Sequence, residues 1–142
     1  MTIIGGKTGR YYLGWIYGTT SAPTAAATYA TLPEMTATIR HAENEAILVH
    51  FNGIFEGSST SGTLVLKLDY QGNAITSEYT IEIPVANKQF LVSFSALIPA
   101  NLAGLTDNDS ATISVQWKET GLGTITATGT MRDLYFQTLK QG

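Results

Sequence analysis

Residues 63–70 read Thr-Leu-Val-Leu-Lys-Leu-Asp-Tyr, and a large apolar side chain occupies every second position from Leu64 to Tyr70. Side chains of a β-strand point alternately to its two faces, so this period places one set in a core and the other towards solvent. The alternation recurs in residues 75–83, where Ile75, Tyr79, Ile81 and Ile83 share the expected buried face, and again in residues 112–118. Residues 64–139 are therefore predicted to form a succession of half-buried strands.

The composition agrees with a single all-β domain that has few charges. The chain has 142 residues, of which 44% are hydrophobic and only 13% charged, about half the usual charged share. A net charge of −3 with dispersed Lys and Arg argues against binding to nucleic acid, which needs clustered cations. No stretch reaches the ~18 apolar residues of a membrane span, and residues 1–18 lack the apolar run of a secretory leader. The absence of cysteine excludes disulfides and thiolate metal sites.

Other stretches add strands and turns to this pattern. We expect a strand at Met35–His41 with Met35, Ala37 and Ile39 inward, and a second at residues 46–55 that is apolar on both faces. Gly57–Gly62 is a predicted loop, and Gln71-Gly72-Asn73 a tight hairpin turn. Further strands are predicted at 89–97, 124–130 and 131–139, with a turn at 86–88 and a loop at 99–110. About eight to ten short strands with regular turns indicate an antiparallel jelly-roll sandwich.

The first 34 residues differ from the rest, because a glycine-rich start and a tract of small residues surround a group of aromatics. We interpret residues 1–34 as an extended arm or a loosely packed edge, and 35–142 as the jelly-roll domain. The aromatics either cover an open edge of their own domain or dock on a partner, and stacking on a sugar is a third, less favoured alternative. They are Tyr11, Tyr12, Trp15 and Tyr17.

Tyr135 and Phe136 are adjacent in a predicted strand, so they point to opposite faces. One of them should lie in the core, and the other should be covered by a neighbouring subunit. Together with the four aromatics near the N-terminus, these two residues make up the predicted interface.

No group of residues predicts catalysis, metal binding or a cofactor. Gly5-Gly6-Lys7-Thr8 lacks the earlier glycine and the strand of a phosphate-binding loop. His41 and His50 are the only histidines, and a zinc site would need help from Glu43 or Glu45, so structural roles are expected for both. Asp107–Ser110 departs from the EF-hand pattern and is predicted to be a turn. An enzyme, such as a hydrolase that uses Glu43, Glu45 or the histidines, is the least favoured function.

Four stretches together resemble the C1q/TNF-like jelly rolls of virion-surface proteins in tailed bacteriophages. They are residues 32–39, which run Leu-Pro-Glu-Met-Thr-Ala-Thr-Ile, then 46–55, 90–97 and 111–118, followed by a Gly-rich loop and closing strands. The likeness spans residues 32–139. It implies a compact homotrimer with the chain ends at one pole, placed on the virion surface after assembly in the host cytoplasm.

The resemblance implies one main function and one alternative. The main function is a non-enzymatic capsid decoration (auxiliary) protein that binds the lattice of the major capsid protein and stabilises the shell, without cofactor, nucleic acid or membrane. Fibre tips usually continue into a stalk, and the short aromatic arm here is more typical of a subunit that grips a capsid or its trimer mate. The alternative is a receptor-binding fibre tip or head fibre that recognises cell-surface carbohydrate through loops Gly57–Gly62 and Thr106–Ser110.

Overall fold

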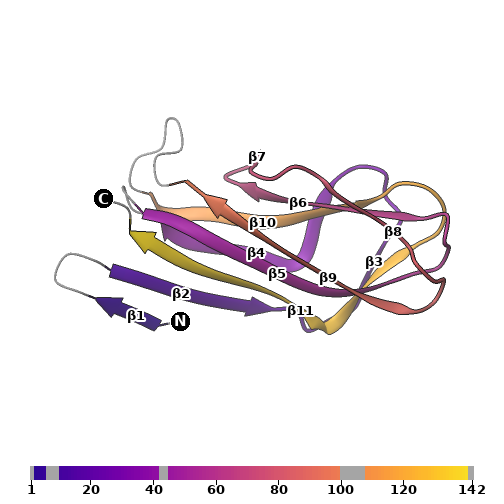
Figure 1. Cartoon of the computed structure of the whole chain (residues 1–142), viewed down its shortest axis with the longest axis horizontal. Coiled ribbons are helices and arrows are strands. Elements are labelled where there is room, and N and C mark those ends of the chain that lie inside the picture. The colour runs from indigo at the N-terminus through magenta and orange to yellow at the C-terminus, as the bar shows by residue number, and fades with distance from the viewer. Residues whose placement is uncertain (1, 6–9, 42–44, 100–107, 141–142) are drawn as a thin grey trace.

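Two antiparallel sheets pack face to face in the computed structural model, which describes residues 2–5, 10–41, 45–99 and 108–140. Figure 1 shows the two layers running along the long axis of the molecule. The six-stranded sheet has the order β1 (Thr2–Gly5), β2 (Arg10–Tyr17), β11 (Ile125–Lys140), β5 (Glu45–Gly57) and β9 (Gln89–Ile98), with β3 (Ala22–Thr24) paired to β11. The five-stranded sheet has the order β4 (Ala30–His41), β10 (Asn108–Glu119), β6 (Thr63–Tyr70) and β7 (Asn73–Ala74), with β8 (Tyr79–Glu82) paired to β6. The predicted all-β, antiparallel jelly-roll sandwich is confirmed, with eleven strands in the described part of the chain.

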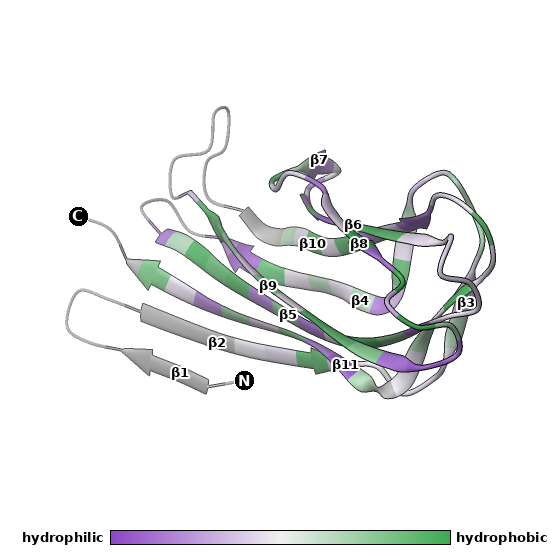
Figure 2. Ribbon diagram, turned by 45° about the vertical axis from the view of Figure 1, so that its right-hand side comes forward, coloured by the Kyte–Doolittle hydropathy of each residue, from purple (hydrophilic) through white to green (hydrophobic). Residues whose placement is uncertain are grey.

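The core lies between the sheets and is filled by the inward half of each alternating strand. Leu64, Leu66 and Leu68 of β6 are fully buried, as predicted, and the inward residues of β4 and β10 are buried as well. Aromatic rings from both sheets meet there, with Phe55 of β5 and Trp117 of β10 at a centroid distance of 6.2 Å. Figure 2 shows a hydrophobic stretch near the start of β5, followed by a mixture of hydrophobic and hydrophilic positions. Burial of such apolar area, at roughly 25 cal/mol per Å², is the main force that holds the sheets together.

Residues 75–83 form less strand than predicted. The tight hairpin is present, with Gln71 and Gly72 at φ 53° and 83°, but regular pairing ends at Ala74 and resumes at Tyr79. Between them the hydroxyl of Thr76 accepts the N–H of Leu68 at 3.0 Å. The Thr76 side chain thus accepts a hydrogen bond that a backbone carbonyl would accept in a regular sheet, and the chain leaves the sheet at this point. Ile83 is buried in the core, and Ile75 and Ile81 pack against it while partly buried. Tyr79 is 36% exposed, so the predicted buried face is present in part but is not continuous.

The two strands predicted at 124–130 and 131–139 are one strand, β11. Its pairing with β5 shifts register between Ala127 and Arg132, which is the signature of a β-bulge. The N-terminal segment also enters the sheet, because β2 pairs with β11 from Leu13↔Gln137 to Tyr17↔Asp133. The division at residue 34 stays a prediction, and β4 runs across it from Ala30 to His41.

Candidate functional site on the outer face of the six-stranded sheet

The side of the six-stranded sheet that faces away from the core carries two cross-strand rows. Strands β2, β11, β5 and β9 are neighbours in that order, so one outward residue of each strand joins a row. The first row is Trp15, Tyr135, His50 and Ser95, and the second is Tyr17, Asp133, Asn52 and Ser93. We call this surface the outer face.

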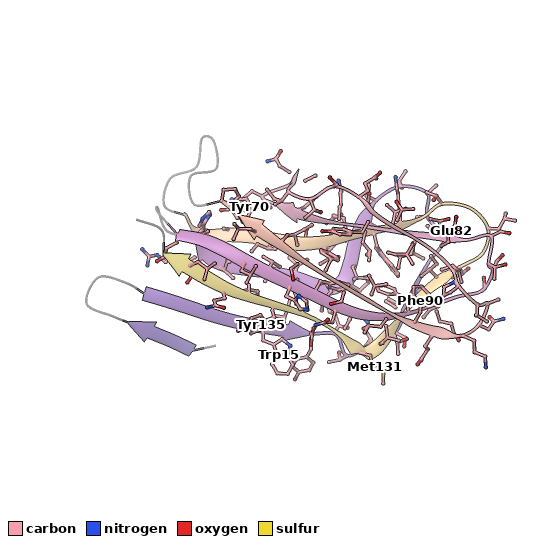
Figure 3. The ribbon with its side chains drawn as sticks, viewed as in Figure 1. Trp15, Tyr70, Glu82, Phe90, Met131 and Tyr135 are labelled. Carbon is pink, nitrogen blue, oxygen red and sulfur yellow. The ribbon has the colours of Figure 1, made fainter. Side chains whose placement is uncertain are left out.

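The outer face exposes large apolar side chains along both of its margins. On the β2–β11 side, Trp15 is 60% exposed, Tyr17 57% and Met131 53%, with Tyr135 beside them. On the β9 side, Leu91 is 65% exposed and Leu97 is exposed as well. Figure 3 shows Trp15 and Met131 at the lower margin of the view, away from β6 and β10. Solvated sheet faces are usually polar, so large apolar side chains exposed at both margins of this face mark a candidate binding surface.

The opposite face of the molecule is of the ordinary polar kind. The outward positions of β4, β10 and β6 are mainly Thr, Ser, Gln and Lys. Tyr29 packs on it between two ammonium groups, with Nζ of Lys67 and Lys118 at 4.3 and 4.4 Å from the ring centroid. The hydroxyl of Tyr29 donates to Glu78, and burial together with this hydrogen bond raises the pKa of Tyr29. These charged groups satisfy one another, so this face does not demand a partner.

A pocket of about 440 Å³ opens on the outer face, and we call it the aromatic hollow. Its lining residues are Trp15, Tyr17, Asn52, Met131, Arg132 and Asp133. The rings of Trp15 and Tyr17 form one wall, with centroids 5.4 Å apart and planes tilted by 43°. Asn52 Nδ2 donates to Asp133 Oδ1 at 3.0 Å, which fixes both polar groups. The hollow therefore combines an apolar wall with a few held polar atoms, as binding pockets commonly do.

Two glycines explain how β2 presents these rings. Gly14 and Gly18 alternate with Trp15 and Tyr17, so they face inward. A Cβ on Gly14 would overlap the ring of Phe136, and one on Gly18 would come within 2.7 Å of the Arg132 side chain. The absence of side chains lets β2 lie directly on these groups, while the aromatic positions between them project outward.

Arg132 anchors the bulge beneath the hollow. It is a charged residue that is almost completely buried, with only 1% of it exposed. It donates from Nε to the carbonyl of Pro33 at 3.0 Å, and from Nη1 to the carbonyls of Thr128 and Gly129 at 3.0 and 3.2 Å. Nη2 pairs with Glu34 Oε1 at 3.0 Å. Burial lowers the pKa of Arg132, and the adjacent Glu34 partly opposes that shift. One buried side chain thus ties the bulge of β11 to β4 of the other sheet.

Glu34 is itself held in an unusual conformation. Its φ is 67°, a left-handed value that is uncommon outside glycine. Its carboxylate accepts the hydroxyls and N–H groups of Thr19 and Thr20 at 2.7–3.0 Å. These hydrogen bonds, led by the Thr19 hydroxyl, lower the pKa of Glu34 to about 2. The carboxylate therefore links the end of β2 to β4 and completes the support of the hollow.

The middle of the outer face is a polar stripe, made of His50, Asn52, Ser93 and Ser95. With its proton on Nε2, His50 donates to Asn52 Oδ1 at 3.2 Å and accepts the Ser95 hydroxyl on Nδ1 at 2.5 Å. The hydroxyl of Ser93 also donates to Asn52 Oδ1, at 2.7 Å. Both ring nitrogens of His50 are thus occupied. Leu48 and Ile54 flank this stripe on β5 and are half-buried, so β5 is less covered on this face than its sequence predicts.

The structure brings together three of the residues predicted for an interface, namely Trp15, Tyr17 and Tyr135. Phe136 lies in the core, 3% exposed, so it is the inward member of the adjacent pair and cannot offer a contact surface. Tyr11 and Tyr12 belong to β2, and their side chains fall outside the described part of the structure. Sequence reasoning missed Asn52, Met131, Asp133, Leu91 and Leu97, although strand parity with Tyr135 already placed Asp133 on the same face.

The two histidines do not form one site. His41, at the end of β4, is buried, and its ring nitrogens contact the Tyr70 hydroxyl at 2.5 Å and the Glu45 carbonyl at 2.6 Å, whereas His50 lies on the outer face. Glu43 and Asp107 fall outside the described residues. Within the ranges that are described, no three His, Asp or Glu side chains group closely enough to hold a metal ion. In that same part of the chain, no helix is long and apolar enough to cross a membrane.

Comparisons with known proteins find similarity of structure only. No protein-family model and no curated sequence match the chain. A chain in the structure of infectious bursal disease virus, Gt strain, matches all of this chain with 11% identity and a TM-score of 0.58, over 43% of its own length. A chain of that virus's VP2 subviral particle matches with 9% identity and a TM-score of 0.52, over 42% of its length. Dimeric latent PorU from Porphyromonas gingivalis matches 92% of this chain with 11% identity and a TM-score of 0.53, over 13% of its length. The chain thus spans less than half of these proteins, and such low identities show a shared fold.

Proposed function

We propose that this chain is a non-enzymatic structural protein of a virus particle, a homotrimeric capsid decoration protein that binds the major capsid lattice from outside and stabilises the shell. The observation that carries this proposal is the outer face, where apolar side chains lie exposed around a polar stripe. The fold shared over the whole chain with chains of virus particles, and the resemblance to phage virion-surface jelly rolls, support the viral setting. The protein would act at the virion surface after assembly in the host cytoplasm, without cofactor, nucleic acid or membrane.

The magnitude of the exposed area favours many repeated contacts over a single tight one. An aromatic side chain offers about 150–250 Å², so covering the exposed half of Trp15, Tyr17 and Tyr135 removes roughly 300 Å² from water. At roughly 25 cal/mol per Å² this is worth about 7 kcal/mol. Association costs about 4–15 kcal/mol in lost freedom of movement. One outer face therefore binds weakly by itself, whereas linked copies on a repeating lattice bind with high avidity.

Cosedimentation with empty particles of the parent virus tests the proposal. A variant with Trp15→Ser and Tyr17→Ser should lose at least ten-fold in apparent affinity. The matched control, Thr36→Ser with Thr38→Ser on the polar face of β4, should bind like the parent chain. Failure of the unmodified chain to bind particles would refute the proposal, as would equal binding by the two variants.

A second function is favoured by the composition of the aromatic hollow. Two exposed rings beside the Asn52–Asp133 pair offer a stacking wall and hydrogen-bonding groups, which suits recognition of a cell-surface carbohydrate by a fibre tip or head fibre. Of the loops first considered for this role, Gly57–Gly62 is tied to its neighbours by backbone bonds such as Ser58 N–Thr124 O at 2.9 Å. Of the other loop, Thr106–Ser110, residues 106 and 107 lie outside the described part, and residues 108–110 are the start of strand β10, not the predicted turn. A glycan array separates the two functions, because saturable binding that Trp15→Ser abolishes would favour the carbohydrate.

A further inference from the structure

We propose that the aromatic hollow receives an arginine side chain of the major capsid protein, held by its two rings and by the carboxylate of Asp133. This inference rests on the proposed function and names the chemistry by which the partner is recognised. Trp15 and Tyr17 offer aromatic faces on which a guanidinium group stacks, and Asp133 offers it a counter-charge.

The first argument is the charge of the outer face. Where the structure describes them, the outward positions of β5, β9 and β11 carry two carboxylates, Asp133 and Glu56, and neither lysine nor arginine. Arg132 also lines the hollow, but its side chain is fully buried and its charge is balanced by Glu34 at 3.0 Å. A partner that meets this surface therefore finds negative charge with no exposed cation beside it, which favours a cationic group over an acidic one.

The second argument is the arrangement of the two rings. The centroids of Trp15 and Tyr17 lie 5.4 Å apart, and both residues are more than half exposed. A cation is attracted to an aromatic face when it lies within about 6 Å of the ring centroid, most strongly for tryptophan. Because the two centroids are closer together than that range, one cation can lie within reach of both rings. A planar guanidinium also stacks on a ring, which an ammonium group cannot do.

The third argument is the fixed position of the Asp133 carboxylate. Asn52 Nδ2 donates to Asp133 Oδ1 at 3.0 Å, and Asn52 is itself held because its Oδ1 accepts the Ser93 hydroxyl at 2.7 Å. A neutral amide orients the carboxylate without neutralising its charge. A carboxylate has about four acceptor sites, so Asp133 still accepts two parallel N–H bonds from a guanidinium. This paired geometry distinguishes arginine from lysine.

The size of the hollow suits a single side chain. Its volume of about 440 Å³ lies in the lower part of the range for sites that take small molecules, about 300–1,000 Å³. A side chain that projects from a capsid subunit enters such a hollow while its backbone stays outside. Cation–aromatic contacts at exposed sites are individually weak, so one arginine binds loosely and many copies on a lattice hold together by avidity.

Titration with N-acetyl-arginine amide, followed through the indole N–H signal of Trp15 in NMR spectra, tests the chemistry of the hollow without a capsid. The Trp15→Phe variant lacks this signal and thereby assigns it, since the chain has two tryptophans. A ligand of this size should bind with a dissociation constant on the order of 1 mM. N-acetyl-citrulline amide has nearly the same shape without the charge and should bind at least ten-fold more weakly.

Two carboxylate variants separate a specific contact from the general charge of the face. Asp133→Asn should weaken arginine binding at least ten-fold and leave citrulline binding unchanged. Glu56→Gln removes the same charge from the same face, outside the residues that line the hollow, and should bind both probes as the parent chain does. Equal binding of the two probes by the unmodified chain would overturn the inference, as would equal losses in the two variants. Saturable glycan binding that Trp15→Phe abolishes, without a preference for arginine over citrulline, would assign the hollow to carbohydrate instead.

Cosedimentation with empty particles of the parent virus separates this inference from the proposed function. Asp133→Asn should lose at least ten-fold in apparent affinity, whereas Glu56→Gln should bind like the parent chain. If the unmodified chain binds particles and Asp133→Asn binds them equally well, the inference fails and the proposed function stands. If the unmodified chain binds no particles, the proposed function fails, and with it the capsid as the source of the arginine, whatever the titration shows.

Discussion

Replacing Arg132 with alanine should destabilise the fold strongly, although the residue belongs to no hydrophobic cluster. The side chain donates hydrogen bonds to three backbone carbonyls and to Glu34. A buried acceptor left without its donor costs about 1–3 kcal/mol. The bond to the Gly129 carbonyl is buried and those to the Pro33 and Thr128 carbonyls are partly buried, so we expect the three together to cost roughly 3 kcal/mol. Glu34 is partly exposed and keeps its bonds from Thr19 and Thr20, so the loss of its partner adds little to this figure.

Urea unfolding followed by fluorescence measures this change at a fixed protein concentration. Lys88→Ala removes the same charge from an exposed turn and should change the free energy of unfolding by less than about 0.5 kcal/mol. Arg132→Lys should recover less than half of the loss, because an ammonium group cannot reproduce the planar fork of the guanidinium. If Arg132→Ala costs less than 1 kcal/mol, or no more than Lys88→Ala, the bulge is not held as we describe.

Three further predictions concern other parts of the molecule. The pKa of Glu34 is lowered to about 2 in the folded chain, so its ionised form adds stability that is present above about pH 4.3 and is lost as the pH falls towards 2. Glu34→Gln should therefore flatten the acid side of a plot of unfolding free energy against pH. An unchanged plot would contradict this. Gly14→Ala places a Cβ inside the ring of Phe136 and should cost at least about 1–3 kcal/mol in thermal unfolding, whereas a neutral result would mean that β2 does not lie on Phe136. Trp15 is exposed and Trp117 buried, so in a Trp117→Phe variant the tryptophan fluorescence comes from Trp15. Acrylamide should quench this fluorescence strongly while the protein is free and less once it is bound to particles. Quenching that does not change on particle binding would exclude Trp15 from the contact.

The period-two pattern was sufficient to predict the sandwich and most of its core. It failed at residues 75–78, where the apolar alternation continues but the chain leaves the ladder. There the Thr76 hydroxyl takes the N–H of Leu68, a competition that no periodicity reveals. The pattern also divided β11 into two strands, because a bulge inserts residues without a turn signal. Both errors arise where a side chain bonds to the backbone: Thr76 with Leu68 in the first case, and Arg132 with the carbonyls around the bulge in the second. Such bonds depend on which residues are neighbours in three dimensions.

The candidate site was only half predictable for a related reason. Aromatic clustering singled out Trp15, Tyr17 and Tyr135, and strand parity showed that Tyr135 and Phe136 must separate. The order of strands in the sheet, which places β2 beside β11 and β9 at the far margin, could not be derived from alternation. Leu91 and Leu97 therefore looked like ordinary strand residues until the topology placed them on an edge of the same face.

The contacts of β2 with Phe136 and Arg132 beneath it make the hollow a better binding surface than exposure of its rings alone would. A docking surface made of mobile side chains loses conformational freedom on binding, at about 0.5–1.5 kcal/mol for each side chain that becomes fixed. Here the strand that carries Trp15 and Tyr17 lies on Phe136 and Arg132 through two glycines, and the bulge beside them is fixed by Arg132 to β4. The backbone that carries the two rings is thus fixed during folding, and the rings lie against each other with centroids 5.4 Å apart, which lowers the ordering cost that remains on binding. Because the gain available from one outer face is about the size of the cost of association, this pre-organisation decides whether the partner is bound at low concentration. Weakening of particle binding by Arg132→Lys, beyond what its loss of folding stability explains, is therefore the expected sign that the support and the surface work together.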